Sequence, residues 1–322
     1  MLGSAALADL AATLRAGRGI AGKRDIAVAA AWLGLSGTGA VPVGDDCAAI
    51  PDGDGFLLLA IEGFISAFVA HDPWFAGWCG VMVNVADVAA MGGRPLAVVD
   101  AVWAHGADGA DALLAGLRAA AEAFGVPIVG GHTNLASDSP QLSVAILGRA
   151  RRLLTSFDAR PGDRLVAAID LRGRYREPFT NWDAATDAPP ARLRGDIEIL
   201  PAIAEVGLAA AAKDISQGGL IGTLLMLTEC SGVGAVVDVA GIPHPAGVPI
   251  DRWLQTFPSF GYMLAVPASR VPEVLARFAA RGIAAADIGA VTANRRIDIA
   301  DGEARDTIWD FSREALIGCG PA

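Results

Sequence analysis

Alternating runs of apolar and polar residues predict strands and helices in turn along the first half of the chain. The first of two helices begins at Asp72-Pro73, because aspartate is a favourable N-cap and proline is favoured in the first turn, and it ends at Gly92. The second helix covers residues 108–124, where leucines recur at helical spacing before Gly125. Strands are predicted at residues 56–62, 96–103, 126–129 and 142–148.

A domain boundary is predicted at residues 151–162, where arginines, Pro161 and Gly162 interrupt the apolar rhythm. Further strands are predicted at residues 164–169, 235–239, 262–266, 286–291 and 296–299, and helices at residues 196–205, 217–230 and 269–281. Because these elements mix without strict alternation, the expected fold class is α+β. The expected domains are residues 1–155 and 156–322.

The composition indicates a globular protein with cores of small aliphatic side chains. Apolar residues make up 53% of the 322 residues, charged residues 19% and aromatic residues 6%. The formal charge of −10 argues against an extended nucleic-acid-binding surface, which needs clustered lysine and arginine. Any bound phosphate is therefore expected to be bridged by metal.

Neither a membrane span nor an export signal is expected. The uncharged run at residues 26–44 is broken by glycines and Pro42, and predicts a helix followed by a turn. The amino terminus carries Asp9 and has no basic region before an apolar one, unlike a secretory signal. The four cysteines lack metal-type spacing, which fits free thiols in a reducing cytoplasm.

Isolated acids in apolar and glycine-rich segments are the main candidates for chemistry. Asp45 and Asp46 are adjacent, and two ionised carboxylates repel each other unless a cation compensates them. A magnesium ion would remove the conflict, and a turn held by Asx-type hydrogen bonds explains the pair equally well. Asp214 is a third acid of this kind.

Asn84 and Asp87 lie three residues apart on the first predicted helix, and hence on one face. Their neighbours are valines and alanines, and no lysine or arginine lies within one helical turn. A carboxylate in such surroundings is costly unless it has a partner. A metal ion or a phosphate-bound water is favoured as the partner of Asp87 over a plain exposed position.

Two glycine pairs are candidates for phosphate binding. Gly130-Gly131 follow a short predicted strand, where they would present backbone N–H groups to an anion or form an ordinary turn. Gly218-Gly219 stand in the first turn of a helix for which Ser216 is the expected cap. Helix N-termini bind phosphate through free N–H groups, and glycine permits close approach.

Three further segments add candidate side chains. Lys23 lies in a basic amino-terminal segment that could clamp triphosphate oxygens. His132 could be a ligand, a proton donor to a phosphoryl oxygen or a turn residue. The long polar segment at residues 172–194 combines aromatic and charged residues, and is expected to be a lid in which Trp182 and Asp183 contact a small-molecule substrate.

Taken in order, these segments resemble the ATP-binding superfamily that includes aminoimidazole ribonucleotide synthetase, thiamine-monophosphate kinase, selenophosphate synthetase and the hydrogenase-maturation carbamoyl dehydratase. The segments that carry the resemblance are Gly-Asp-Asp-Cys-Ala-Ala at 44–49, Asn-Val-Ala-Asp-Val-Ala-Ala-Met-Gly at 84–92, Gly-Gly-His-Thr at 130–133, Asp-Ile-Ser-Gln-Gly-Gly at 214–219 and Ala-Asp-Ile-Gly-Ala-Val at 286–291.

The resemblance implies an amino-terminal α/β domain whose sheet pairs with that of a second subunit in a barrel-like dimer core, and a carboxy-terminal α+β domain. ATP would lie between the domains, with magnesium ions on its phosphates. The positions that match metal-binding acids are Asp45, Asp46, Asp87 and Asp214. The positions that match nucleotide-site segments are Asn84, Gly130, Gly131 and Thr133.

The chain departs from the kinase pattern at Glu62, His132 and Gln217, and this leaves the acceptor unassigned. The sequence predicts a magnesium-dependent, ATP-binding enzyme of the kinase or synthetase type that phosphorylates or activates an oxygen of a small metabolite. The alternative is a non-catalytic, nucleotide-binding dimeric scaffold of the same fold.

Overall fold

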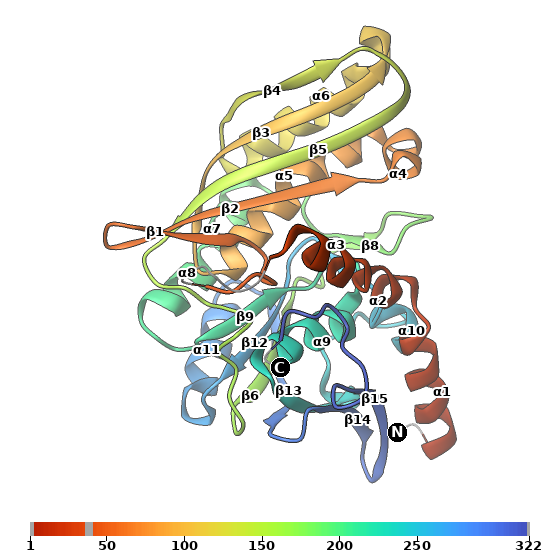
Figure 1. The fold of residues 1–322 in the computed structure, drawn as a ribbon, viewed down its shortest axis with the longest axis vertical. Helices are drawn as coiled ribbons and strands as arrows, with labels where there is room; N and C mark the ends of the chain where they lie inside the picture. The colour runs from red at the N-terminus through yellow and green to blue at the C-terminus, as the bar shows by residue number, and fades with distance from the viewer. Residues whose placement is uncertain (1–2, 36–40, 321–322) are drawn as a thin grey trace. The chain divides into compact units, whose positions relative to one another are not determined.

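The computed structural model of the protein describes residues 3–35 and 41–320. The chain divides into two compact units, and each of them is discontinuous in sequence. Unit 1 consists of Met1–Asp45, Leu154–Ala184 and Val206–Ala322, and unit 2 consists of Asp46–Leu153 and Ala185–Glu205. Both units combine helices with sheets, so the α+β class is confirmed (Figure 1).

The units differ from the predicted domains in two places. Helix α1 (Ser4–Arg15) belongs to unit 1, where Leu7 and Leu10 share a core with Trp309. Residues 185–205 belong to unit 2, where Arg94 forms ion pairs with Glu198 and Glu205. Apolar spacing identifies a buried helix face but does not say which of two cores receives it.

Unit 2 is built on a five-stranded sheet. Its strand order is β1 (Ala48–Asp52), β2 (Gly55–Phe64), β5 (Ala136–Ala150), β3 (Arg94–His105) and β4 (Ile128–Asn134). Helices α5 (Pro73–Ala90) and α6 (Gly106–Phe124) pack together, and α5 contacts β2, β3 and β5 (Figure 1). The remaining helices of the unit are α4 (Ser66–His71), α7 (Pro190–Ile197) and α8 (Ile199–Glu205).

Helix α5 follows its sequence signals closely. The Asp72 carboxylate accepts the backbone N–H of Phe75, as expected of the cap before Pro73. Two glycines let α5 and α6 approach each other, because a Cβ on Gly77 would meet the Leu113 carbonyl and a Cβ on Gly116 would meet the Trp74 carbonyl. The close crossing buries nearly the whole of α5.

The two faces of this sheet differ in exposure. The face toward α5 is closed, and Leu58, Val98 and Ile146 are at most 2% exposed. On the opposite face Ile61 and Val99 both pair with Ala145, and they are 69% and 42% exposed. Unit 2 therefore presents an apolar sheet face that nothing in the described chain covers.

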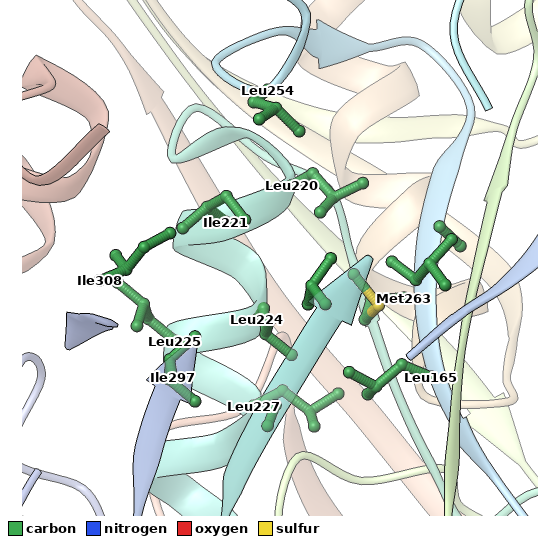
Figure 2. Close-up of a cluster of buried hydrophobic side chains, with 14 of the residues drawn as sticks. Leu165, Leu220, Ile221, Leu224, Leu225, Leu227, Leu254, Met263, Ile297 and Ile308 are labelled. Atoms are coloured by element: carbon green, nitrogen blue, oxygen red, sulfur yellow. The ribbon is translucent and has the colours of Figure 1, made fainter. Parts of the chain in front are cut away.

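Unit 1 contains a seven-stranded sheet. Its order is β15 (Ala304–Asp310), β14 (Arg296–Asp301), β10 (Gly234–Asp238), β13 (Ala284–Thr292), β6 (Arg164–Ile169), β12 (Gly261–Val266) and β9 (Ala211–Asp214). Helix α9 (Gly219–Ser231) is buried against the sheet. In Figure 2 Leu220 and Leu224 of α9 point toward Met263, and Ile221 and Leu225 point toward Ile308 and Ile297.

Short helices complete unit 1. They are α2 (Arg18–Lys23), α3 (Asp25–Leu33), α10 (Ile250–Trp253) and α11 (Val271–Ala279), with single 3-10 turns at Val239–Gly241 and Ala268–Arg270. The helix predicted within residues 26–44 is present as α3, and the turn predicted after it falls partly on residues 36–40, outside the described chain. Within residues 3–35 and 41–320 no helix is long and apolar enough to cross a membrane.

The aromatic part of the segment at residues 172–194 is folded into a small sheet and is not an open loop. Strands β7 (Arg174–Tyr175) and β8 (Asn181–Asp183) join β11 (Phe257–Pro258) in a small sheet of unit 1. Trp182 is 6% exposed, belongs to the unit 1 core and donates its indole N–H to the Asp170 carbonyl at 3.0 Å. The Asp183 carboxylate is buried and faces Arg176 at 3.7 Å. The predicted substrate contacts of both residues are therefore corrected to structural ones.

Candidate active site

Unit 2 brings Asp46 and Asp87 together. Asp87 lies on α5 and is 5% exposed, so the plain exposed position is excluded. Carboxylate oxygens of the two residues lie within 4.8 Å of each other. Mg²⁺ binds oxygen at about 2.1 Å, so two ligands of one ion lie up to about 4.2 Å apart. A small side-chain adjustment would let both carboxylates bind one ion.

Asn84 anchors α5 to the sheet. Its side-chain N–H₂ donates to the Gly80 carbonyl at 2.8 Å and to the Val144 carbonyl of β5 at 3.0 Å. Its Oδ1 is buried and accepts no hydrogen bond from the described residues. The side chain is fully buried, so its visible role is to fix the helix turn that carries Asp87.

Asp45 belongs to unit 1 and is held by protein donors. Its Oδ2 accepts the Ser156 backbone N–H and its Oδ1 accepts the Ser156 hydroxyl, both at 2.7 Å. Lys213 Nζ lies 3.9 Å from the same Oδ1. These contacts favour a positioning role for Asp45 rather than the predicted metal-ligand role. Sequence reasoning did not single out Ser156 or Lys213, although Lys213 directly precedes Asp214.

In unit 1 the strand β9 ends at Asp214, and a glycine loop leads into α9. Asp214 is 3% exposed, and its backbone carbonyl accepts the Thr223 hydroxyl of α9 at 3.1 Å. Gly219 has φ +64° and packs so closely on Leu254 that a Cβ would meet its carbonyl. Gly219 therefore has a structural use, and phosphate binding by the glycine pair stays a prediction.

The predicted side-chain cap of α9 is wrong. The N-cap residue is Gly218, which has no side-chain cap, and Ser216 contributes only its carbonyl, which accepts the Gly219 N–H at 2.9 Å. The N-terminus of a thirteen-residue helix is thus free of a protein side-chain cap. Such an end can accept an anion through its N–H groups and dipole.

Helix α2, which carries Lys23 at its end, is docked on this loop. A Cβ on Gly19 would meet the Gln217 carbonyl, and Ile20 packs against Gly222 of α9. The basic segment is therefore not a loose tail. Gly19 and Ile20 make these contacts, and the action of Lys23 on a bound phosphate stays a prediction.

The segment Gly130–Thr133 is a strand, which excludes the ordinary turn that was the alternative to an anion-binding segment. It lies in β4, an edge of the sheet, where β3 supplies its pairing partners. A Cβ on Gly131 would lie 2.8 Å from the carboxylate oxygens of Asp100, a group whose pKa is raised by burial. The His132 ring lies 5.8 Å from the Trp103 ring. Parallel pairing with β3 takes precedence over the turn tendency of the glycine pair.

Two family descriptions match the chain in order. The N-terminal domain of AIR synthase related protein matches residues 44–150, and its C-terminal domain matches residues 179–302. The chain belongs to the AIR synthase related family. This confirms the family resemblance that the sequence motifs indicate.

Two relatives of this chain cover 97% and 62% of its length. The protein sll0787 of Synechocystis sp., itself uncharacterized, is 46% identical over 97% of this chain and 98% of its own length. Thiamine-monophosphate kinase of Pyrococcus horikoshii is 31% identical over 62% of this chain and 67% of its own. The solved structure of Thermotoga maritima PurL complexed with ADP has a TM-score of 0.74 at 20% identity, over 89% of this chain and 48% of that one, which shows the fold alone.

Proposed function

We propose that the protein is a magnesium-dependent enzyme that uses ATP to phosphorylate or activate an oxygen of a small metabolite. The observation that carries the proposal is the close approach of the half-buried Asp46 carboxylate and the buried Asp87 carboxylate, because a divalent cation stabilises two acids this close to each other. The similarity to a thiamine-monophosphate kinase supports ATP as the phosphoryl donor.

Asp46 and Asp87 would hold Mg²⁺ in unit 2. We propose that Asp214 also binds metal, because it is a buried acid at the end of β9 beside the glycine loop of unit 1. A bound Mg²⁺ ion neutralises negative charge on the phosphates. The N-terminus of α9 would bind a phosphate oxygen, and Lys23 would add a point charge from α2. These residues position phosphates and form no covalent intermediate.

The decisive experiment measures the release of ADP or AMP from ATP across a panel of small metabolites, with and without Mg²⁺. Metabolite-dependent release that requires Mg²⁺ is the expected result. Magnesium-dependent binding of ATP without any turnover across the panel would favour the scaffold, and absence of nucleotide binding would reject both functions.

We further propose that the open sheet face of unit 2 pairs with a second copy of the chain. Leu59 and Leu147 are cross-strand partners and are 48% and 38% exposed, and Ile61 extends this patch. An antiparallel sheet normally presents polar side chains to water on its open face. A second copy offers the same apolar surface under twofold symmetry, and this agrees with the barrel-like dimer core that the family resemblance implies.

The dimer prediction can be tested by placing one charged side chain on the open sheet face. Ile61→Glu is expected to weaken self-association at least about tenfold, because a carboxylate would be buried in an apolar contact without a partner. Light scattering at low micromolar concentration measures the effect, with Leu114→Glu as control, since Leu114 is 41% exposed on helix α6 of the same unit. A stable folded monomer in the unchanged protein would refute this arrangement.

A further inference from the structure

The acid pair Asp45-Asp46 raises the question of what neutralises each carboxylate. At Asp45 the structure gives an answer within unit 1. Lys213 Nζ lies 3.9 Å from Asp45 Oδ1, and the two side chains are 5% and 1% exposed. A buried ammonium and a buried carboxylate at this distance compensate each other far more than an exposed pair does.

The rest of the Asp45 environment is made of protein donors. Ser156 donates its backbone N–H to Oδ2 and its hydroxyl to Oδ1, both at 2.7 Å. Ser156 is itself fixed, because it is fully buried and its carbonyl accepts the Ser231 hydroxyl at the end of α9 at 2.7 Å. Both carboxylate oxygens therefore have donors that are rigidly placed.

The backbone before Asp45 is also fixed. Gly44 has φ +129°, and a Cβ there would clash with Cys319, so only glycine fits. Its carbonyl accepts the Cys230 thiol at 3.6 Å. Burial raises the pKa of this thiol, and the positive charge of Lys213 acts against that rise. The ammonium charge thus acts on the Cys230 thiol beside Gly44 as well as on Asp45.

We infer that the Lys213 ammonium is a built-in cation that occupies the place of a metal ion at Asp45. The acid pair is then neutralised in two ways, by lysine at Asp45 and by a divalent ion at Asp46. The claim for lysine at Asp45 stands on the Lys213–Asp45 contact alone, and the claim for a divalent ion at Asp46 rests on the proposed function. Without the ammonium, Asp45 Oδ1 and the Ser156 hydroxyl would be oxygen ligands suited to a hard cation.

The inference is tested by counting bound Mn²⁺ from the paramagnetic resonance of the free ion. Lys213→Met is expected to bind about one Mn²⁺ per chain more than the unchanged protein, because the Asp45 carboxylate loses the ammonium that neutralises it. Lys213→Arg keeps the charge and should bind the same number as the unchanged protein. Lys213→Met combined with Asp45→Asn should lose the additional ion. An equal Mn²⁺ count in Lys213→Met and the unchanged protein would overturn the inference.

Folding gives a second readout if Lys213→Met is unstable. Folding of this variant in millimolar Mn²⁺ but not in chelator, followed by circular dichroism, supports the inference. Failure to fold in either condition, while the double variant folds, would overturn it, since no metal would then replace the ammonium. Because the test compares variants, absence of Mn²⁺ from the unchanged protein would count against Asp46 and Asp87 as ligands and not against Lys213.

Discussion

Asp87→Asn is expected to weaken Mg²⁺-dependent ATP binding at least about a hundredfold, since loss of even an outer partner of a metal ligand costs about 10- to 100-fold in metal affinity. The substitution keeps the shape of a side chain that is 5% exposed, and removes the charge that pairs with Asp46 around the proposed ion. Asp214→Asn is expected to act in the same direction. Calorimetric titration with ATP, in the presence and absence of Mg²⁺, measures the ATP affinity of both variants.

The control for this titration is Asp111→Asn, which removes an exposed carboxylate from helix α6 of the same unit. It should leave the ATP affinity unchanged. If both Asp87→Asn and Asp214→Asn retain the fold and bind ATP as tightly as the unchanged protein, the metal account of the site is refuted.

Trp182→Ala is expected to lower the free energy of unfolding of unit 1 by about 3–5 kcal/mol, as large-to-small changes of buried aromatic residues do. The indole packs edge-to-face on Tyr175 and Trp253, with ring centroids 5.2 and 5.3 Å away, and its N–H is satisfied by the Asp170 carbonyl. Alanine would leave a cavity and an unsatisfied carbonyl. Urea denaturation followed by tryptophan fluorescence measures the loss.

Trp32→Ala is the matched control, because Trp32 is 87% exposed on α3 of the same unit. Its effect should stay within about 0.5 kcal/mol, as for most surface substitutions. A Trp182→Ala variant as stable as the unchanged protein, and weakened only in substrate binding, would return Trp182 to the surface role that the sequence predicts.

Local chemistry is enough to predict the elements that end on strong signals. Asp72-Pro73 predicts the start of α5, and Gly125, with φ +73°, follows the end of α6. In the same way the apolar surroundings of Asp87 predict that it is buried and needs a partner. These features depend on caps, on glycine conformations and on desolvation, which act over a few residues.

Contacts between distant segments are decided by the tertiary structure. Nothing near Asp45 in sequence indicates that Ser156 and Lys213 hold its carboxylate, because they are 111 and 168 residues away along the chain and meet it only through packing in unit 1. From the sequence, the aromatic residues around Trp182 fit a ligand-binding surface as well as they fit a buried core. The contact of Trp182 with Trp253, which is remote in sequence, places Trp182 in the core.

The sequence by itself determined the family and the α+β class and named the acids that are candidates for binding a cation, since each of these depends on residue type and local order. Only the tertiary structure decided that Asp46 and Asp87 lie within 4.8 Å of each other, while Asp45 is neutralised by lysine. The reason is physical: which charge compensates a buried carboxylate depends on distance and burial, and these are set by the packing of segments that are remote in sequence.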